Sequence, residues 1–365
     1  MTIRRIRAFR QWQPFADGTY SCSGGSADGL DSTIVAVTDA DGVTGWGEAA
    51  PLGAFYDPAF VGGLRAGIAE LAPLLLGRPA TPRAAQRFMD VALKGHPYAK
   101  SALDMALCDL GARRAGFPLV EALGGVAGEA VDLYRAISAD TPAAMAARAT
   151  DYVGRGYRRL QVKLGEHPER DAERLAAVRD AVGADVTLFA DANGLYSTAD
   201  ARRFLRAAAG IDFWLEQPCA TYEECRAVRE VCPVPLVLDE SIDSLAALVR
   251  AVGDRVPDAV TLKIARIGGV TRTAQLRDVA VDLGLHVTVE DTGGSDIDTA
   301  AIAHVSLSTP AERRLHTVDF NSWVTVANAT GMPAPAAGRL TAPTGSGLGV
   351  DVLEDALGEA FVDAR

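Results

Sequence analysis

The chain has 365 residues, of which 48% are hydrophobic, enough to bury a sizeable core in one large barrel or in two domains. A net charge of −11 and a pI near 5.0 oppose binding to nucleic acid, so we expect a small-molecule partner. The sequence shows neither an apolar run of 18 residues nor a signal peptide, so we expect no membrane partner and a cytoplasmic location.

The first 125 residues are typical of an α+β domain. Alternating apolar residues predict antiparallel strands near residues 3–10, 31–38 and 44–48. Apolar residues then recur at helical spacing from about residue 59 to 123, and the helical pattern stops at a pair of glycines. Strands followed by helices, without alternation, indicate a domain distinct from the rest of the chain.

From residue 126 to 337, short apolar runs end in polar residues at regular intervals. Steps of 28, 25, 23 and 24 residues separate Lys163, Asp191, Glu216, Asp239 and Lys263. A repeat of that length holds one strand, one helix and two loops, which is the unit of a parallel α/β barrel. We therefore predict a modified (β/α)7β TIM-type barrel over residues 126–337. An α+β capping domain is expected over residues 1–125, and the tail, 338–365, is expected to return to it.

Three of these strand-end residues are acids on consecutive strands. Asp191, Glu216 and Asp239 are expected side by side at the barrel mouth, where they cannot all stay ionised without a cation. Oxygen ligands without a nearby Cys or His pair suit Mg²⁺. The alternative is that each acid only caps the following helix, but three acids at matched spacing favour the metal site.

The two lysines are expected on opposite sides of the barrel. Lys163 and Lys263 end the second and sixth strands, so their amines would face each other across a substrate. Desolvation near a divalent ion lowers the pKa of a lysine toward neutrality, which makes it a usable general base. The alternative for each is an ordinary surface lysine paired with a carboxylate.

These motifs resemble those of the enolase superfamily, in its muconate lactonizing enzyme subgroup. The resemblance rests on the segments 161–163, 191–193, 216–218, 239–241 and 262–269. It implies Mg²⁺ on the three acids, bound to the substrate carboxylate and stabilising an enediolate while the two lysines move the α-proton. It also implies that Gln161, Asn193 and Glu240 surround these groups. Gln161 departs from the usual Lys-x-Lys motif, which argues against a muconate cycloisomerase.

Within the subgroup, the chain is similar to the branch that acts on proline derivatives, the cis-3-hydroxy-L-proline dehydratases and hydroxyproline betaine epimerases. This resemblance rests on residues 95–104, 133–138, 216–219 and 319–323. It implies that Tyr56 and Trp323 hold the cationic nitrogen of the substrate, worth about 1 kcal/mol or more. The other expected substrate contacts come from the two N-terminal loops and the last strand ends: Ser26, Phe55, Asp291 and Asp319.

The resemblance therefore implies a magnesium-dependent dehydratase of a cyclic amino acid, cis-3-hydroxy-L-proline, in a homo-oligomer. A racemase or epimerase of proline, proline betaine or N-acyl amino acids would use the same two lysines and is the alternative. A muconate cycloisomerase and a non-catalytic binder of a small acid are further alternatives. The intact set of three acids and two lysines argues against the non-catalytic binder.

Overall fold

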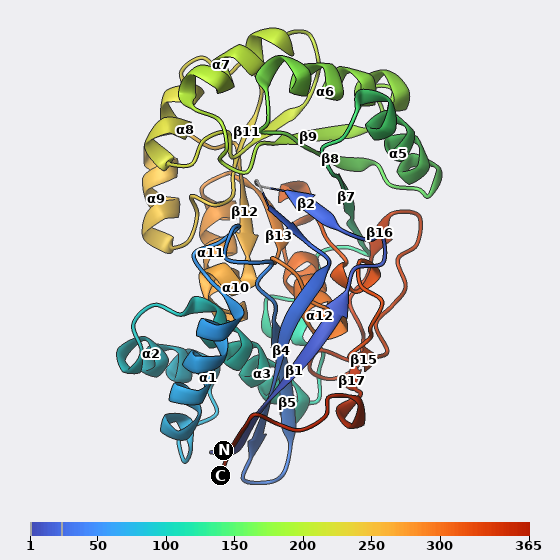
Figure 1. Ribbon diagram of the computed structural model, residues 1–365. Coiled ribbons are helices and arrows are strands. Elements are labelled where there is room, and N and C mark those ends of the chain that lie inside the picture. The colour runs from blue at the N-terminus through green and yellow to red at the C-terminus, as the bar shows by residue number, and fades with distance from the viewer. Residues whose placement is uncertain (1, 23–24) are drawn as a thin grey trace.

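The computed structural model describes residues 2–22 and 25–365 and divides into a barrel and a cap (Figure 1). Eight parallel strands follow one another around the barrel in chain order: β7 (Tyr134–Ile137), β8 (Arg159–Lys163), β9 (Thr187–Asp191), β10 (Trp214–Glu216), β11 (Leu236–Leu238), β12 (Ala259–Lys263), β13 (His286–Glu290) and β14 (Arg314–Thr317). A parallel bridge between Leu133 and Thr317 joins the first strand to the last. The predicted modified (β/α)7β TIM-type barrel is confirmed.

Helices connect the strands and surround the barrel (Figure 1). They are α5 (Pro142–Gly154), α6 (Pro168–Val182), α7 (Thr198–Ala207), α8 (Tyr222–Arg229), α9 (Leu245–Gly253), the short α10 (Ile264–Ile267), α11 (Val270–Asp282) and α12 (Asp296–Leu307). Four of them begin where a hydroxyl side chain accepts a backbone N–H of the first turn, a strong local start signal. These caps are Thr141, Ser197, Thr221 and Ser244.

The interior of the barrel is packed rather than hollow. Side chains two residues apart on a strand point the same way, so the residue two positions before each strand-end polar group also points inward. Phe189 lies in this way below Asp191, and it clusters with Val237, Ala259 and Leu315. The strand-end acids and lysines lie at one mouth of the barrel, above this layer.

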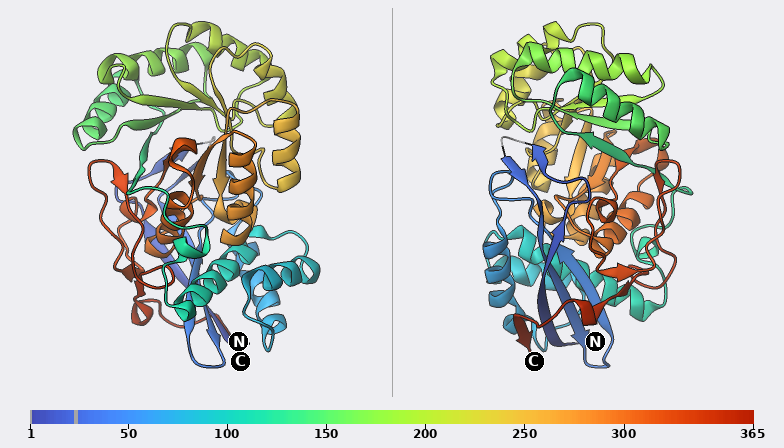
Figure 2. Two further views of the ribbon diagram at one scale, coloured as in Figure 1. Left: turned by 180° about the vertical axis from the view of Figure 1, so that it is seen from behind. Right: turned by 45° about the vertical axis from the view of Figure 1, so that its right-hand side comes forward.

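The cap is built on an antiparallel sheet in the order β18-β1-β4-β5, with helices beside it (Figure 2). Its strands are β1 (Ile3–Pro14), β4 (Gly29–Asp39), β5 (Thr44–Ala49) and β18 (Val362–Ala364), and its helices are α1 (Val61–Leu75), α2 (Pro82–Ala92), α3 (Pro97–Ala115) and α4 (Leu119–Ala122). β18 comes from the C-terminal tail and pairs with β1, which brings both termini to the same end of the molecule. None of the helices in the described residues is long and apolar enough to cross a membrane.

Small two-stranded elements complete the fold. The hairpin of β2 (Tyr20–Cys22) and β3 (Gly25–Ala27) extends from the cap toward the barrel. The tail strands β16 (Arg339–Leu340) and β17 (Asp351–Val352) pair with β6 (Val131–Asp132) and β15 (Ala329–Thr330), and three 3-10 turns are η1 (Ala311–Arg313), η2 (Phe320–Ser322) and η3 (Glu354–Ala356).

Glu48 of β5 joins the cap to the barrel. Its carboxylate accepts the side-chain amide of Gln13 at 2.7 Å and the backbone N–H groups of Ser295 and Asp298, each at 3.1 Å. Those two N–H groups lie at the start of α12, where a helix has unsatisfied donors and a favourable field for an anion. The contact fixes the cap over the barrel mouth.

Candidate active site

Strand register brings the strand-end polar groups together. Lys163 is the register partner of Asp191, which in turn is the partner of Glu216 on the next strand. Val237 is the partner of Glu216, so Asp239 follows two residues beyond it, and Lys263 is the partner of Glu290. The lysines and acids are at most 6% exposed. The five residues expected to form the site do converge at one mouth.

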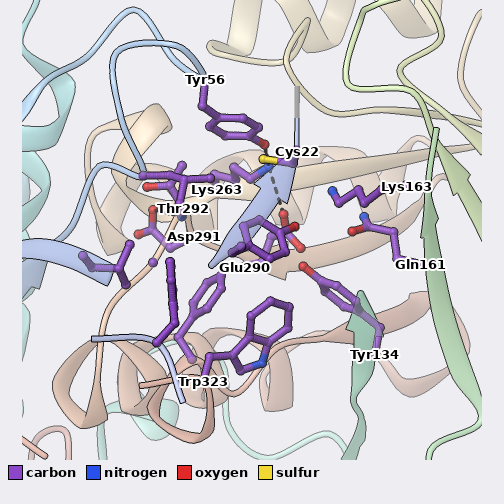
Figure 3. Close-up of a pocket in the computed structure, with 16 residues that line it drawn as sticks. Cys22, Tyr56, Tyr134, Gln161, Lys163, Lys263, Glu290, Asp291, Thr292 and Trp323 are labelled. Carbon is purple, nitrogen blue, oxygen red and sulfur yellow. Dashed lines mark hydrogen bonds and ion pairs between the residues drawn. The ribbon is translucent and has the colours of Figure 1, made fainter. Parts of the chain in front are cut away.

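The two lysine amines point toward each other across a pocket between the cap and the barrel (Figure 3). Lys163 Nζ donates to Asp191 Oδ2 at 2.6 Å. Lys263 Nζ lies 2.5 Å from Asp239 Oδ2 and 3.0 Å from Glu290 Oε1. Each amine is therefore tied to a carboxylate of its own wall.

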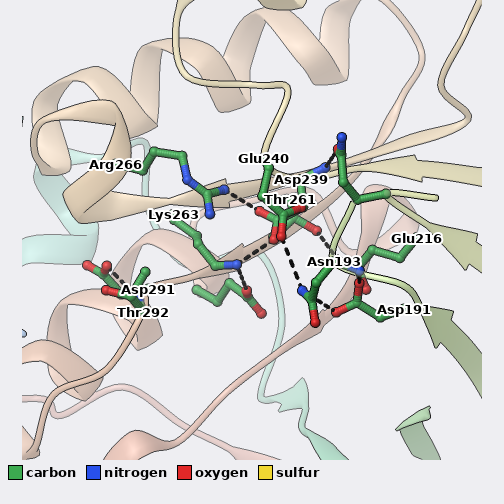
Figure 4. A network of polar contacts seen from close by, with 12 residues as sticks. Asp191, Asn193, Glu216, Asp239, Glu240, Thr261, Lys263, Arg266, Asp291 and Thr292 are labelled. Carbon is green, nitrogen blue, oxygen red and sulfur yellow. Dashed lines mark hydrogen bonds and ion pairs between the residues drawn. The ribbon is translucent and has the colours of Figure 1, made fainter. Parts of the chain in front are cut away.

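Further polar side chains hold the acids in place (Figure 4). Gln161 Nε2 and Thr261 Oγ1 donate to the two oxygens of Glu216 at 2.8 and 3.0 Å. The Asn193 amide donates to Asp191 at 3.0 Å and to Glu240 at 3.1 Å, so it bridges two acids. Gln161, Asn193 and Glu240 thus lie around the acids, where the resemblance puts them.

Arg266 contributes a contact that was not expected from the sequence. Its guanidinium donates to Asp239 Oδ1 at 2.5 Å and to Asp57 Oδ1 at 3.1 Å. Arg266 lies on α10, three residues after Lys263 at the end of β12, within the segment 262–269 that carries the family resemblance. Arg266 therefore links Asp239, one of the three strand-end acids, to the loop of the cap that carries Tyr56.

The acids differ in how their charge is compensated. Burial raises the pKa of Glu216 well above its usual range, and the nearby Asp191 and Asp239 raise it further. Burial raises the pKa of Glu240 to about 8, again with help from neighbouring acids. Burial alone would also raise the pKa of Asp239, but Arg266 and Lys263 hold it at about 2.

The lowered lysine pKa was expected beside a divalent ion, whereas beside the carboxylates alone the pKa of each lysine is raised. Burial does lower the pKa of Lys163 and of Lys263, but the paired carboxylates outweigh it and both values lie well above the usual range. The reason is that each ammonium takes the place of a cation beside a buried acid. A divalent ion bound to those acids would deprive each lysine of its carboxylate partner.

The donor set fits a hard divalent cation. Five acids surround the mouth with three basic side chains among them: the buried Asp191, Glu216, Asp239 and Glu290 and the half-buried Glu240, with Lys163, Lys263 and Arg266. All the donors are oxygens, which Mg²⁺ prefers. In the described part of the chain, no three His, Cys, Asp or Glu side chains lie in an arrangement that could hold a metal ion. Lys163, Lys263 and Arg266 form ion pairs with the carboxylates there.

The pocket between the lysines is small and has walls from both parts of the molecule. Its cavity volume is about 40 Å³. The cap provides Phe15, Tyr20, Cys22, Leu30, Leu52 and Tyr56, and the barrel provides Tyr134, Gln161, Lys163, Lys263, Glu290, Asp291, Thr292, Gly293, Phe320 and Trp323.

Tyr56 and Trp323 lie on opposite walls of this pocket (Figure 3). The Tyr56 hydroxyl accepts from Lys263 Nζ at 2.5 Å, and the same ammonium lies 5.0 Å from the ring centroid. The Trp323 ring lies 5.2 Å from the Arg135 guanidinium and 5.8 Å from the Tyr20 ring. Each ring therefore already has a cationic side chain beside it.

The other four expected contacts are placed differently. Ser26 is exposed in β3, and Phe55 is 41% exposed with its ring against Gly25 of the hairpin. Asp319 is buried beside Arg135, and none of these three is among the residues that line the pocket. Asp291 does line it, but its two oxygens accept backbone N–H groups at the start of α10 and at position 292.

Sequence reasoning did not single out Tyr20, Cys22, Tyr134 or Glu290 as pocket residues, although it placed specificity in residues 20–26 and at the ends of the last two strands. For Glu290 a signal exists. Strand alternation makes Thr288 and Glu290 point inward when Val287 and Val289 point outward. For the cap residues there is none, since their position depends on the path of the hairpin.

Comparison with known proteins gives matches along nearly the whole chain. The family "Enolase C-terminal domain-like" matches residues 144–356, and "Mandelate racemase / muconate lactonizing enzyme, N-terminal domain" matches residues 19–124. Cis-3-hydroxy-L-proline dehydratase of Roseibium aggregatum is 41% identical over 361 residues, 98% of each chain. D-Ala-D/L-Ala epimerase of Cytophaga hutchinsonii is 30% identical over 76% of each chain.

Solved structures agree over the full length. A mandelate racemase/muconate lactonizing enzyme from Roseovarius nubinhibens, complexed with magnesium, has a TM-score of 0.96 at 36% identity and covers 100% of both chains. A dipeptide epimerase from Cytophaga hutchinsonii, complexed with magnesium and D-Ala-L-Val, has a TM-score of 0.93 at 25% identity.

Proposed function

Because the chain belongs to the mandelate racemase/muconate lactonizing enzyme family of the enolase superfamily, we propose that it is a magnesium-dependent dehydratase of cis-3-hydroxy-L-proline. The observation that carries the proposal is the pair of lysine amines facing each other across the pocket, beside three buried acids on consecutive strands. The relative that is 41% identical over 98% of both chains is a dehydratase of this substrate and supports its assignment here.

Asp191, Glu216 and Asp239 are proposed to hold the magnesium ion. Bound there, the ion would offset the negative charge that develops on the substrate carboxylate as the α-proton leaves. Gln161 and Thr261 orient Glu216, and Asn193 orients Asp191, so these side chains position the ligands. Magnesium in solved relatives of similar fold supports this assignment.

Lys163 and Lys263 are proposed to divide the proton transfers. One amine takes the α-proton, the electron pair of that C–H bond forms a double bond from Cα to Cβ, and the Cβ–O bond breaks. The other lysine, as an ammonium, gives its proton to the departing hydroxyl, which leaves as water. In the cis isomer the hydroxyl lies on the face opposite the α-hydrogen, so two groups on opposite walls match the two transfers.

An epimerase is the second candidate, because racemisation needs one base on each face of Cα and uses the same two lysines. The relatives named as epimerases favour it. The difference is the leaving group: an epimerase returns a proton to Cα, whereas a dehydratase loses the hydroxyl from Cβ.

The test is incubation of the protein with Mg²⁺ in deuterium oxide, followed by proton NMR. The panel contains cis-3-hydroxy-L-proline, L-proline, L-proline betaine and an N-acyl amino acid. We expect loss of water from the first compound, and exchange without net racemisation for L-proline. Accumulation of racemised proline at a rate matching any dehydration would favour the epimerase instead.

A further inference from the structure

The pocket wall contains two carboxylates, and they differ in how many of their oxygens are engaged. Asp291 accepts the backbone N–H of Ala265 on Oδ2 at 2.9 Å and that of Thr292 on Oδ1 at 2.7 Å. Both of its oxygens are therefore committed to the backbone where α10 begins. Its place in the pocket wall does not make it available to a ligand.

Glu290 has an oxygen left over. Its Oε1 lies 3.0 Å from Lys263 Nζ and the Tyr134 hydroxyl lies beside the carboxylate, while Oε2 has no donor in full hydrogen-bond geometry among the described residues, although the residue is only 3% exposed. The carboxylate points into the pocket between Lys263 and the hydroxyl end of Tyr134 (Figure 3). A buried carboxylate oxygen that lacks a well-placed donor is available to accept an N–H from a ligand in the pocket.

The position of this oxygen matches one atom of an α-amino acid. Nitrogen is bonded directly to Cα, so the group that receives it must lie next to a side chain that acts on Cα. Glu290 is the register partner of Lys263 and contacts its amine, and it therefore lies at that place. Charge is also complementary at Glu290 itself, since Lys263 lies on Oε1 of its carboxylate and a substrate ammonium would bring a second cation to Oε2.

We propose that Glu290 Oε2 accepts an N–H of the substrate's ring ammonium, so that the pocket selects carboxylates with a free secondary amine over quaternary betaines and N-acyl derivatives. A secondary ring ammonium carries two N–H groups, whereas a betaine nitrogen carries none and an acylated ring nitrogen has neither N–H nor charge. This rests on the proposed function only for the identity of the ring. The proposed contact distinguishes free imino acids from betaines by the presence of an N–H donor, and not by charge alone.

The test compares three ring carboxylates that differ at one position. They are L-proline, L-proline betaine and (S)-tetrahydrofuran-2-carboxylate, in which oxygen replaces the ammonium. Binding is measured by titration calorimetry with Mg²⁺ present, for the wild type and for Glu290→Gln, which keeps the shape and loses the charge. We expect the wild type to bind L-proline at least tenfold more tightly than either analogue. In the variant that ratio falls to within about threefold of one, because L-proline loses a charge-assisted hydrogen bond that neither analogue forms.

Two variants control for indirect effects. Tyr134→Phe changes the neighbour of Glu290 and keeps its charge, so the ligand ratio of the wild type is expected to persist. Glu290→Asp is expected to retain part of the preference, and it replaces the glutamine variant if that protein fails to fold by thermal melting. Equal weakening of all three ligands in Glu290→Gln, or unchanged binding of L-proline, overturns the proposal.

Measurement of turnover distinguishes a failure of the Glu290 contact from a failure of the proposed function. A wild type that prefers L-proline through Glu290 but does not dehydrate cis-3-hydroxy-L-proline would refute the proposed function and leave this contact standing. A wild type that dehydrates it, with a preference unaffected by Glu290→Gln, would refute only the contact.

Discussion

Lys163 Nζ donates to Oδ2 of Asp191, its register partner on the neighbouring strand, at 2.6 Å. At the opposite wall Lys263 Nζ donates to Asp239 Oδ2 at 2.5 Å, although the register partner of Lys263 is Glu290. The groups proposed to move protons thus pair with the groups proposed to bind metal. A cation on the acids would displace the ammonium groups, so metal binding and release of the lysine amines would be coupled in this site.

Removal of metal is expected to abolish activity. Chelation leaves the acids with their lysine partners, so neither amine is free to take the α-proton. Activity is measured after exhaustive chelation and again after Mg²⁺ is restored, and the binding of Mg²⁺ to Asp239→Asn is measured by calorimetry. We expect the variant to bind Mg²⁺ more weakly than the wild type. Full activity in the chelated protein would refute metal dependence.

Replacement of either lysine by alanine is expected to reduce dehydration by about 10²–10⁴-fold, the usual contribution of one acid–base group. The two variants should differ in a second measurement. The variant that keeps the base should still exchange the α-proton of L-proline with deuterium, and the other should not. Exchange that survives in both variants would contradict a division of labour between Lys163 and Lys263.

Gln217 positions the end of β11 without contacting a substrate. Its Oε1 accepts the backbone N–H of Asp239 at 3.1 Å and of Ser241 at 3.3 Å, and its Nε2 donates to Ser241 Oγ at 2.7 Å. We expect Gln217→Met to lower Mg²⁺ affinity by about 10–100-fold, as for other residues that orient metal ligands. Gln86→Met, at a buried glutamine in the interface of the cap, is the matched control and should leave Mg²⁺ affinity unchanged.

Two glycines offer a matched test of how closely the cap packs. A Cβ at Gly47 of β5 would overlap the carbonyl of Ala102 in α3, so Gly47→Ala is expected to lower the free energy of unfolding by about 1–3 kcal/mol. Gly111 lies in the same helix with open space around it, and Gly111→Ala should raise stability by about 0.5–1 kcal/mol. Urea unfolding of both variants measures these changes. Equal changes in the free energy of unfolding would contradict the close contact between β5 and α3.

His304 makes stability depend on acid pH. Its Nδ1 accepts the N–H of Val120 at 3.2 Å and its Nε2 lies 3.1 Å from the carbonyl of Leu348, so the neutral ring satisfies both contacts. Burial lowers its pKa to about 4, whereas an unfolded histidine titrates near about 6.5. Between those values only the unfolded chain binds the proton, so stability falls as pH decreases from 6.5 toward 4.

The His304→Gln variant removes this contribution. From pH 7 to pH 5, the wild type should lose about 2 kcal/mol more unfolding free energy than the variant. Urea titrations at the two pH values measure the difference. A loss of the same size in both proteins would show that His304 is not the titrating group.

The sequence itself determined the barrel and the convergence of its three strand-end acids. The regular steps between Lys163 and Lys263 report one strand and one helix per repeat, and a repeating unit of that kind has few alternatives. Because all parallel strands end at the same mouth, residue order alone brings Asp191, Glu216 and Asp239 together. Local periodicity therefore carries enough information for the fold and for this part of the site.

Only the tertiary structure decided which side chains complete the pocket. Tyr20 and Cys22 of the hairpin line it while Ser26 and Phe55 do not, because the path of a cap segment over the barrel follows from packing and not from periodicity. Glu290 and Asp291 are adjacent in sequence, yet one points into the pocket and the other binds the backbone at the start of α10. The lysine pKa values depend likewise on which acid each amine meets in space, and that pairing is a property of the assembled barrel.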